Sequence, residues 1–145
     1  MNIKELEDEW EQDCIIDEYK LDLESLKSSK LHAKYMRLLV DHKLKNVKLR
    51  QDYLNLRQNK YRWIQGKMTK QELADLGWEQ YLYNKPLKSE TDELLKGDVE
   101  LSGLDAKMEY INTMIYLLEE IIKSIKDRTW SIRNAIEFQK FQAGN

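Results

Sequence analysis

Apolar residues in the last third of the chain recur at alternating steps of four and three. This first stripe consists of Leu104, Met108, Ile111, Ile115, Leu118, Ile122, Ile125, Thr129, Ile132 and Ile136. A second stripe, Tyr110, Met114, Leu117 and Ile121, runs beside it. The spacing predicts one long helix, and two adjoining stripes make its apolar face too broad for a single partner helix. We expect one stripe to pack within the chain and the other to meet a neighbouring subunit. The alternative is one helix buried in a monomeric core.

A second long helix is predicted from about residue 26 to residue 65, where neither glycine nor proline interrupts the sequence. Its seam positions also step by four and three: Tyr35, Leu39, His42, Asn46, Leu49, Tyr53, Leu56, Lys60 and Trp63. A helix of about 38 residues is roughly 57 Å long at ~1.5 Å per residue, so it must pair with another long helix.

Shorter elements precede and follow this helix. Residues 3–12 predict a short helix with an acidic surface, and Gly66 is expected to end the long helix. Thr69 and Glu72 have the spacing of a capping box, which predicts a helix over residues 70–83 before Pro86. Residues 87–103 predict a connector with one turn of helix at residues 92–96, punctuated by Gly97 and Gly103. The fold class is therefore all-α, a long helical hairpin-like subunit in a single domain, with parts at residues 1–70, 71–103 and 104–145.

Charge is strongly segregated along the chain. Residues 27–70, here called the basic block, contain thirteen Lys and Arg but only Asp41 and Asp52 as acids. The flanking segments are acidic, and the total charge is only −2. This asymmetry favours a polyanion as the partner of the basic block. The acidic N-terminal segment is either a solvated helix face or an arm that contacts a basic partner or masks the chain's own basic block.

Candidate chemistry is sparse. The two histidines, His32 and His42, fall on different helix faces, and a single cysteine, Cys14, leaves no spacing typical of a metal site. Neither a phosphate-binding glycine loop nor a nucleophile beside a base is present, so we expect neither an enzyme nor a cofactor. The acidic start argues against a signal peptide, and the most apolar run is too short and too charged to span a bilayer.

The basic block remains as the candidate site. Arg57, Lys60, Arg62 and Lys67 could neutralise phosphates, and Tyr61 and Trp63 among them could stack on unpaired bases. The simpler interpretation is a solvated basic helix whose aromatic residues belong to the seam. The pattern favours polyanion binding.

Three stretches occur in a fixed order along the chain. They are the opening Leu6-Glu7-Asp8 with Asp13-Cys14-Ile15-Ile16-Asp17 and Lys20-Leu21, the motif Lys60-Tyr61-Arg62, and the ending Ile125-Lys126, Arg128, Ile132-Arg133, Ile136 and Phe141-Gln142-Ala143-Gly144. In this order they resemble segments of the UvsY family of phage recombination mediators. Residues 68–100 diverge. The resemblance implies a non-enzymatic helical protein that forms a ring of six or seven subunits in the cytoplasm of the infected bacterial host. It also implies binding to single-stranded DNA and to two protein partners, a RecA-like recombinase and a single-strand-DNA-binding protein.

The resemblance implies Lys60 and Arg62 as DNA contacts and the C-terminal helices as the oligomer interface. Combined with the stripes, this gives Ile111, Met114, Ile115, Leu118, Ile121, Ile122, Ile125, Ile132 and Ile136 as expected interface residues. The main alternative is a coiled-coil adaptor whose basic block binds an acidic protein. A helix lying on a membrane surface fits less well, because the apolar and basic positions do not separate into opposite faces.

Overall fold

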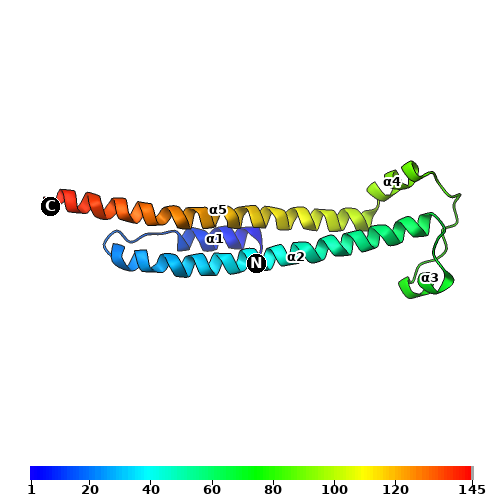
Figure 1. Ribbon diagram of the computed structural model, residues 1–145, viewed down its shortest axis with the longest axis horizontal. Coiled ribbons are helices and arrows are strands. Elements are labelled where there is room, and N and C mark those ends of the chain that lie inside the picture. Colours follow the sequence, from blue (N-terminus) through cyan, green and yellow to red (C-terminus); the bar gives the residue numbers. More distant parts are fainter. Residues whose placement is uncertain (145) are drawn as a thin grey trace. The chain divides into compact units, whose positions relative to one another are not determined.

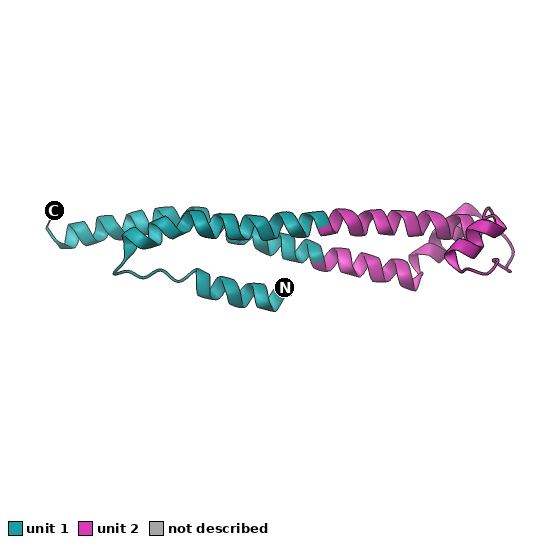
Figure 2. Cartoon of the chain, turned by 90° about the horizontal axis from the view of Figure 1, so that it is seen from below, with its two compact units in different colours: residues 1–44, 111–145 teal, residues 45–110 magenta. Residues whose placement is uncertain are grey.

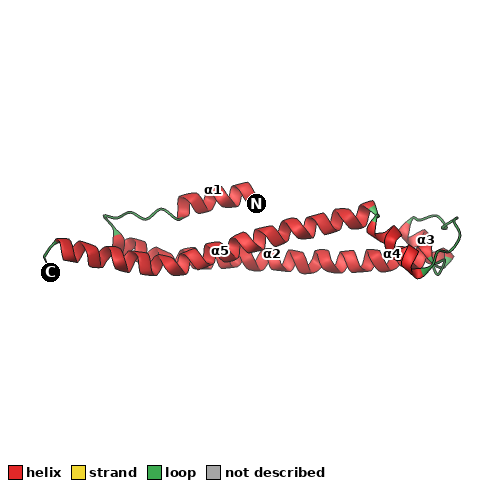
Figure 3. Cartoon of the chain, turned by 90° about the horizontal axis from the view of Figure 1, so that it is seen from above, coloured by secondary structure: helices red, strands yellow, loops and turns green. Residues whose placement is uncertain are grey.

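A computed structural model describes residues 1–144 and is all-α over that range (Figures 1 and 3). Its helices are α1 (Ile3–Asp13), α2 (Leu21–Ile64), α3 (Lys70–Leu76), α4 (Lys88–Lys96) and α5 (Val99–Gln142). The chain divides into two compact units (Figure 2). Unit 1 comprises residues 1–44 and 111–145, and unit 2 comprises residues 45–110. The long helices α2 and α5 each contribute to both units, so unit 1 consists of two separate stretches of sequence, whereas unit 2 is one continuous stretch.

The start of α1 follows from a capping box that the sequence analysis did not use. The Asn2 side chain accepts a hydrogen bond from the Glu5 backbone N–H at 2.8 Å, and the Glu5 carboxylate accepts one from the Asn2 N–H at 2.9 Å. These bonds satisfy two donors that the first turn would otherwise leave open. The predicted helix over residues 3–12 is confirmed to within one residue.

Unit 1 is a three-helix core in which α1 packs on α2 and α5 (Figure 1). Its buried members are Leu6, Tyr35, Leu39, Met114, Leu118, Ile121, Ile122 and Ile125, with Ile3 and Trp10 packed against them. The second stripe on α5 therefore has a partner inside the chain: Met114 and Ile121 are buried in the same core as Leu6 of α1. Our inference that this stripe lacked an intrachain partner was wrong, because it left the apolar face of α1 out of account.

Polar contacts hold α1 on the basic helix. Lys34 Nζ contacts Glu9 Oε1 at 2.5 Å and Asp13 Oδ2 at 2.6 Å, and the Tyr35 hydroxyl donates to Asp13 Oδ2 at 2.7 Å. Burial alone would raise the pKa of Asp13, but the Lys34 and Tyr35 hydrogen bonds bring it below its ordinary value of 3.8. The acidic N-terminal segment thus neutralises part of the basic block, as one of the two interpretations expected.

The end of α2 and both ends of α3 lie in unit 2 and follow from local sequence signals. Gly66, with φ +68°, ends α2 as predicted, and Thr69 accepts from the Glu72 N–H at 3.1 Å at the start of α3. The helix stops at Leu76 instead of residue 83, because Gly77 adopts a left-handed conformation (φ +70°) and the Trp78 N–H bonds to the Leu73 carbonyl.

The core of unit 2 is small. Ile64, Leu95 and Leu101 are buried, and Tyr53, Leu56, Tyr61, Trp63 and Tyr81 pack against them. Gln65 is also buried and donates to Thr91 Oγ1 at 2.6 Å, which joins the end of α2 to α4. Two expectations were wrong here: α4 begins at Lys88 instead of residue 92, and α5 begins at Val99 and continues through Gly103. The missed signal for α5 is Asp98, whose Oδ2 accepts from the Leu101 N–H at 3.0 Å.

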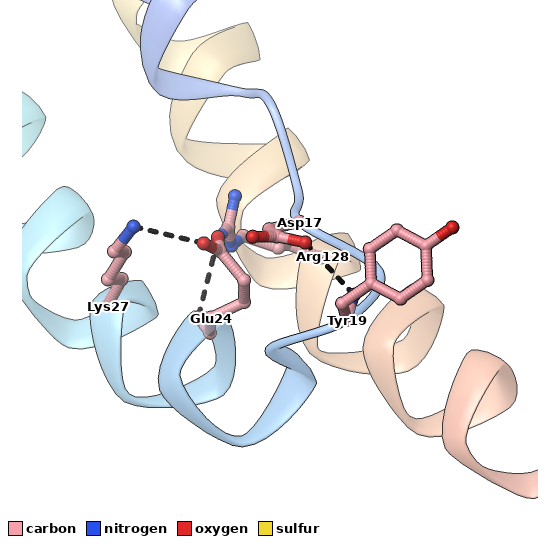
Figure 4. Close-up of polar contacts among 5 residues, drawn as sticks. All are labelled: Asp17, Tyr19, Glu24, Lys27 and Arg128. Carbon is pink, nitrogen blue, oxygen red and sulfur yellow. Dashed lines mark hydrogen bonds and ion pairs between the residues drawn. The ribbon is translucent and has the colours of Figure 1, made fainter.

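A buried ion pair joins α2 and α5 within unit 1. Arg128 reaches from α5 to the carboxylate and the backbone carbonyl of Glu24 near the start of α2 (Figure 4). Both side chains are almost fully inaccessible to solvent, although Glu24 also accepts from Lys27 at 3.0 Å. The hydrogen bond from Lys27 lowers the pKa of Glu24, burial opposes it, and Arg128 lowers the pKa further. This pair could not be predicted from the sequence, because its members are 104 positions apart.

Candidate nucleic-acid interface

The chain's own acids neutralise about half of the basic block. Six of its thirteen cations are in ion pairs: Lys27, Lys34, Lys43, Arg57, Lys60 and Arg62. Three of the six are residues that the sequence analysis placed at the DNA site. Partners of these three come from α3, α4 and the start of α5, the part of the sequence that showed the weakest resemblance.

Lys60 is the most enclosed of the expected DNA contacts. Its side chain is 11% exposed, and Nζ lies 2.7 Å and 2.8 Å from the two carboxylate oxygens of Asp98 and 3.3 Å from Glu100 Oε1. Burial favours the neutral form of Asp98, but the Lys60 hydrogen bond and the Leu101 N–H lower its pKa below 3.8. Lys60 therefore occupies a seam position as an ion-paired residue, and does not project freely into solvent.

Arg62 and Arg57 are more accessible but also paired. Arg62 grips Glu72 with two hydrogen bonds, of 2.6 Å and 3.1 Å, and donates a third to the Lys67 carbonyl at 3.2 Å. The Arg62 hydrogen bond lowers the pKa of Glu72. Arg57 contacts Asp92 Oδ1 at 3.1 Å across exposed surface. Glu72, which the capping-box pattern assigned to Thr69, thus holds an arginine with its side chain.

The aromatic residues of the candidate site have structural partners. Trp63 Nε1 donates to the Glu79 carbonyl at 2.7 Å, and its ring lies 5.8 Å from Trp78 and 5.1 Å from Tyr81. Tyr61 packs on the unit 2 core. Both side chains keep an intermediate exposure. The rings of Trp78 and Tyr81, from the divergent segment, therefore cover part of the Trp63 ring that was expected to be free to stack on bases.

The remaining seven cations of the basic block are exposed and form no ion pair within residues 1–144. They are Lys30, Arg37, Lys45, Lys48, Arg50, Lys67 and Lys70. Of the four cations expected to bind DNA, only Lys67 is in this group. Lys45, Lys48 and Arg50 lie within six residues of one another on α2 in unit 2, and they were not among the expected site residues. The available signal was their position outside the seam, which Asn46 and Leu49 occupy.

The expected oligomer residues are mostly interior. Met114, Leu118, Ile121, Ile122, Ile125 and Ile132 are buried within the single chain, and Ile111, Ile115 and Ile136 are half-buried. The six buried side chains therefore offer no free surface on this subunit. Exposed apolar side chains occupy another face near the end of α5, where Trp130, Phe138 and Phe141 are 62%, 60% and 77% exposed.

Other kinds of site are not indicated in the described part of the chain. Residues 1–144 contain no group of three His, Cys, Asp or Glu side chains that could hold a metal ion. Over the same range, no helix has an apolar stretch long enough to cross a membrane. His42 is buried on the seam and its Nδ1 donates to the Leu38 carbonyl at 2.8 Å, which agrees with the expected structural role.

Comparison with solved structures identifies the fold. The structure matches crystal structures of the bacteriophage T4 recombination mediator protein UvsY. Lattice type II has a TM-score of 0.82 and 20% identity, and the match covers 99% of this chain and 98% of that one. Lattice type I has a TM-score of 0.83 and 17% identity, with 95% and 98% covered. A sequence comparison with curated proteins gives no match.

The fold and the exposed cations define an all-α protein with a basic helix, a class typical of polyanion-binding proteins. The family model described as "Recombination, repair and ssDNA binding protein UvsY" matches residues 9–145. The chain belongs to the UvsY family. The resemblance seen in the sequence is thereby confirmed, including over residues 68–100, where the motifs alone could not be matched.

Proposed function

We propose that this chain binds single-stranded DNA and helps to load a RecA-like recombinase onto DNA covered by single-strand-binding protein, in the cytoplasm of the infected host. Family membership supports this function. The observation that carries it is the set of seven exposed, unpaired cations of the basic block. Such cations bind phosphates without sequence preference and release counterions, which suits a protein that must act anywhere along a strand.

In this proposal, Lys45, Lys48, Arg50 and Lys67 make the first phosphate contacts. Lys60, Arg62 and Arg57 contact DNA only after they exchange a carboxylate for a phosphate. Tyr61 and Trp63 then offer the exposed parts of their rings to bases. An adaptor that binds an acidic protein is less well supported, because the family description names single-stranded DNA.

Assembly into a ring of six or seven subunits forms part of the proposal. A ring repeats the same weak site, and the linked sites gain affinity without new contacts. We assign the contact between subunits to the C-terminal end of α5, where Trp130, Phe138 and Phe141 form an exposed apolar stripe at helical spacing. Ile136 and the other half-buried members of the first stripe would line its edge.

Replacing Lys45, Lys48 and Arg50 together by alanine tests the phosphate contacts. We expect affinity for a fluorescent oligo-dT to fall about tenfold or more at low salt. The slope of log affinity against log salt concentration should also become shallower by the equivalent of about two phosphate contacts, at ~0.7 per contact. The measurement is fluorescence anisotropy over a series of salt concentrations. The matched control replaces Lys85, Lys88 and Lys107, three exposed lysines outside the basic block. Equal losses in both triple variants would count against the proposed surface.

Glu72→Gln tests whether the chain's acids compete with DNA. The substitution removes the charge that holds Arg62, so we expect affinity for oligo-dT to rise several-fold at low salt. The control is Asp75→Asn, which removes one exposed charge from the same helix without touching Arg62. Competition at Arg62 is disproved if both variants gain equally, since only net charge would then matter.

A further inference from the structure

A polar hollow lies between α2 and α5 in unit 1. It has a volume of about 280 Å³ and is lined by Ser28, Ser29, His32, Ile125, Lys126 and Thr129. Liquid water takes about 30 Å³ per molecule, so the hollow has room for a group much larger than one water. Each polar side chain in this lining can donate a hydrogen bond, and none is a carboxylate.

Unpaired buried donors lie at and beside this hollow. Ser28 Oγ is buried and has no hydrogen-bond partner. One helical turn earlier on α2, Glu24 binds Nη2 of Arg128, while Nε and Nη1 of the same guanidinium are buried without an acceptor. A buried donor left unpaired costs about 1–3 kcal/mol. These atoms are closed to solvent, so a ligand in the hollow would be held by the accessible side chains of its lining, Ser29, His32, Lys126 and Thr129.

The local charge favours an anion. Lys126 is exposed and forms no ion pair within the described residues. Asp127 is the acid next to Lys126 in sequence, and the Glu24 carboxylate is already bound by Arg128 and Lys27. In unit 2, by contrast, carboxylates form ion pairs with Lys60 and Arg62.

We propose that this hollow binds a phosphate group, held by Ser29, His32, Lys126 and Thr129. A phosphate presents several acceptor oxygens and negative charge, and hydroxyl and cationic side chains are the usual partners of backbone phosphates. The assignment of that phosphate to the backbone of single-stranded DNA rests on the proposed function. Binding of the phosphate group itself does not. The site would give the strand a contact in unit 1 in addition to those proposed at Lys45, Lys48 and Arg50 in unit 2.

The chain's two histidines provide a direct readout. His32 lines the hollow, whereas His42 is buried in the seam and serves as the internal reference. We expect inorganic phosphate, added at constant ionic strength and pH, to shift the His32 ring NMR signals in a saturable way and to leave those of His42 unchanged. Lys126→Met should weaken this phosphate binding about tenfold, and Thr129→Val should weaken it as well. The control Lys123→Met removes an exposed lysine from the same helix and should leave it unchanged.

Oligo-dT provides the second arm of the test. Saturable shifts of His32 with both ligands support a DNA phosphate, and shifts with inorganic phosphate alone support a free anion in the same site. No His32 response to either ligand overturns the inference. If oligo-dT binds by anisotropy while His32 does not respond, the inference fails and the proposed function stands. In the Lys45, Lys48 and Arg50 triple variant, a retained response to inorganic phosphate with lost DNA affinity separates the two sites.

Discussion

Glu24→Ala is expected to destabilise unit 1 by about 3–5 kcal/mol, because it leaves the Arg128 guanidinium buried without a counter-charge. Removing the other partner, by Arg128→Met, should lower the stability less, since Glu24 keeps its hydrogen bond from the largely exposed Lys27. The double variant Glu24→Leu, Arg128→Met should recover most of the loss, because it removes both charges and the unpaired guanidinium nitrogens.

Urea unfolding followed by circular dichroism and by tryptophan fluorescence measures these effects. Trp10 reports on unit 1, since its ring packs against Tyr35 at 5.4 Å. The matched control is Asp22→Ala, which removes an exposed acid from the same turn of α2 and should change stability little. A loss for Glu24→Ala no greater than for this control would show that the pair contributes nothing.

Met114→Asp is the second substitution with a large expected effect. Met114 is fully buried, so an aspartate there places an unpaired charge among Leu6, Tyr35 and Ile121. We expect a loss of at least about 4 kcal/mol, enough to unfold unit 1. Trp130→Ser, on the exposed face of the same helix, is the matched variant. It should leave the circular dichroism and the unfolding midpoint nearly unchanged but reduce the mass of the native oligomer.

The comparison separates core from interface on one helix. Native mass is measured by light scattering for each variant that remains folded. If Trp130→Ser, alone and combined with Phe138→Ser, keeps the mass of the parent protein, the proposed subunit contact is wrong. A folded Met114→Asp variant of reduced mass would instead show that Met114 contributes to a contact between subunits.

The long helices could be predicted because their buried positions repeat at helical spacing along the sequence. Every seam position of α2 from Tyr35 to Trp63 is buried or half-buried, including His42 and Lys60, which a count of apolar residues alone would have rejected. The ends of α2 and α3 followed from Gly66 and Thr69. The span of α5 was underestimated because Gly103 was interpreted as a break, whereas an isolated glycine in a long helix costs only about 1 kcal/mol.

The candidate site was less predictable, because pairing between charges depends on tertiary structure. The sequence shows that Lys60 and Arg62 lie in a basic stretch, but their partners Asp98 and Glu72 come from segments that periodicity did not place. The same reason hid Glu24 and Arg128. Lys45, Lys48 and Arg50 were visible in the sequence, but no aromatic residue lies among them, and it was the interleaved Tyr61 and Trp63 that defined the expected site.

One carboxylate in unit 2 serves two tasks at once. Asp98 Oδ2 accepts from the Leu101 N–H that opens α5, and the same oxygen lies 2.8 Å from Lys60 Nζ. If a phosphate draws Lys60 away, Asp98 loses its strongest cationic neighbour while it still caps the helix. Binding of a phosphate by Lys60, near the end of α2, would then affect the first turn of α5 through this one oxygen atom of Asp98.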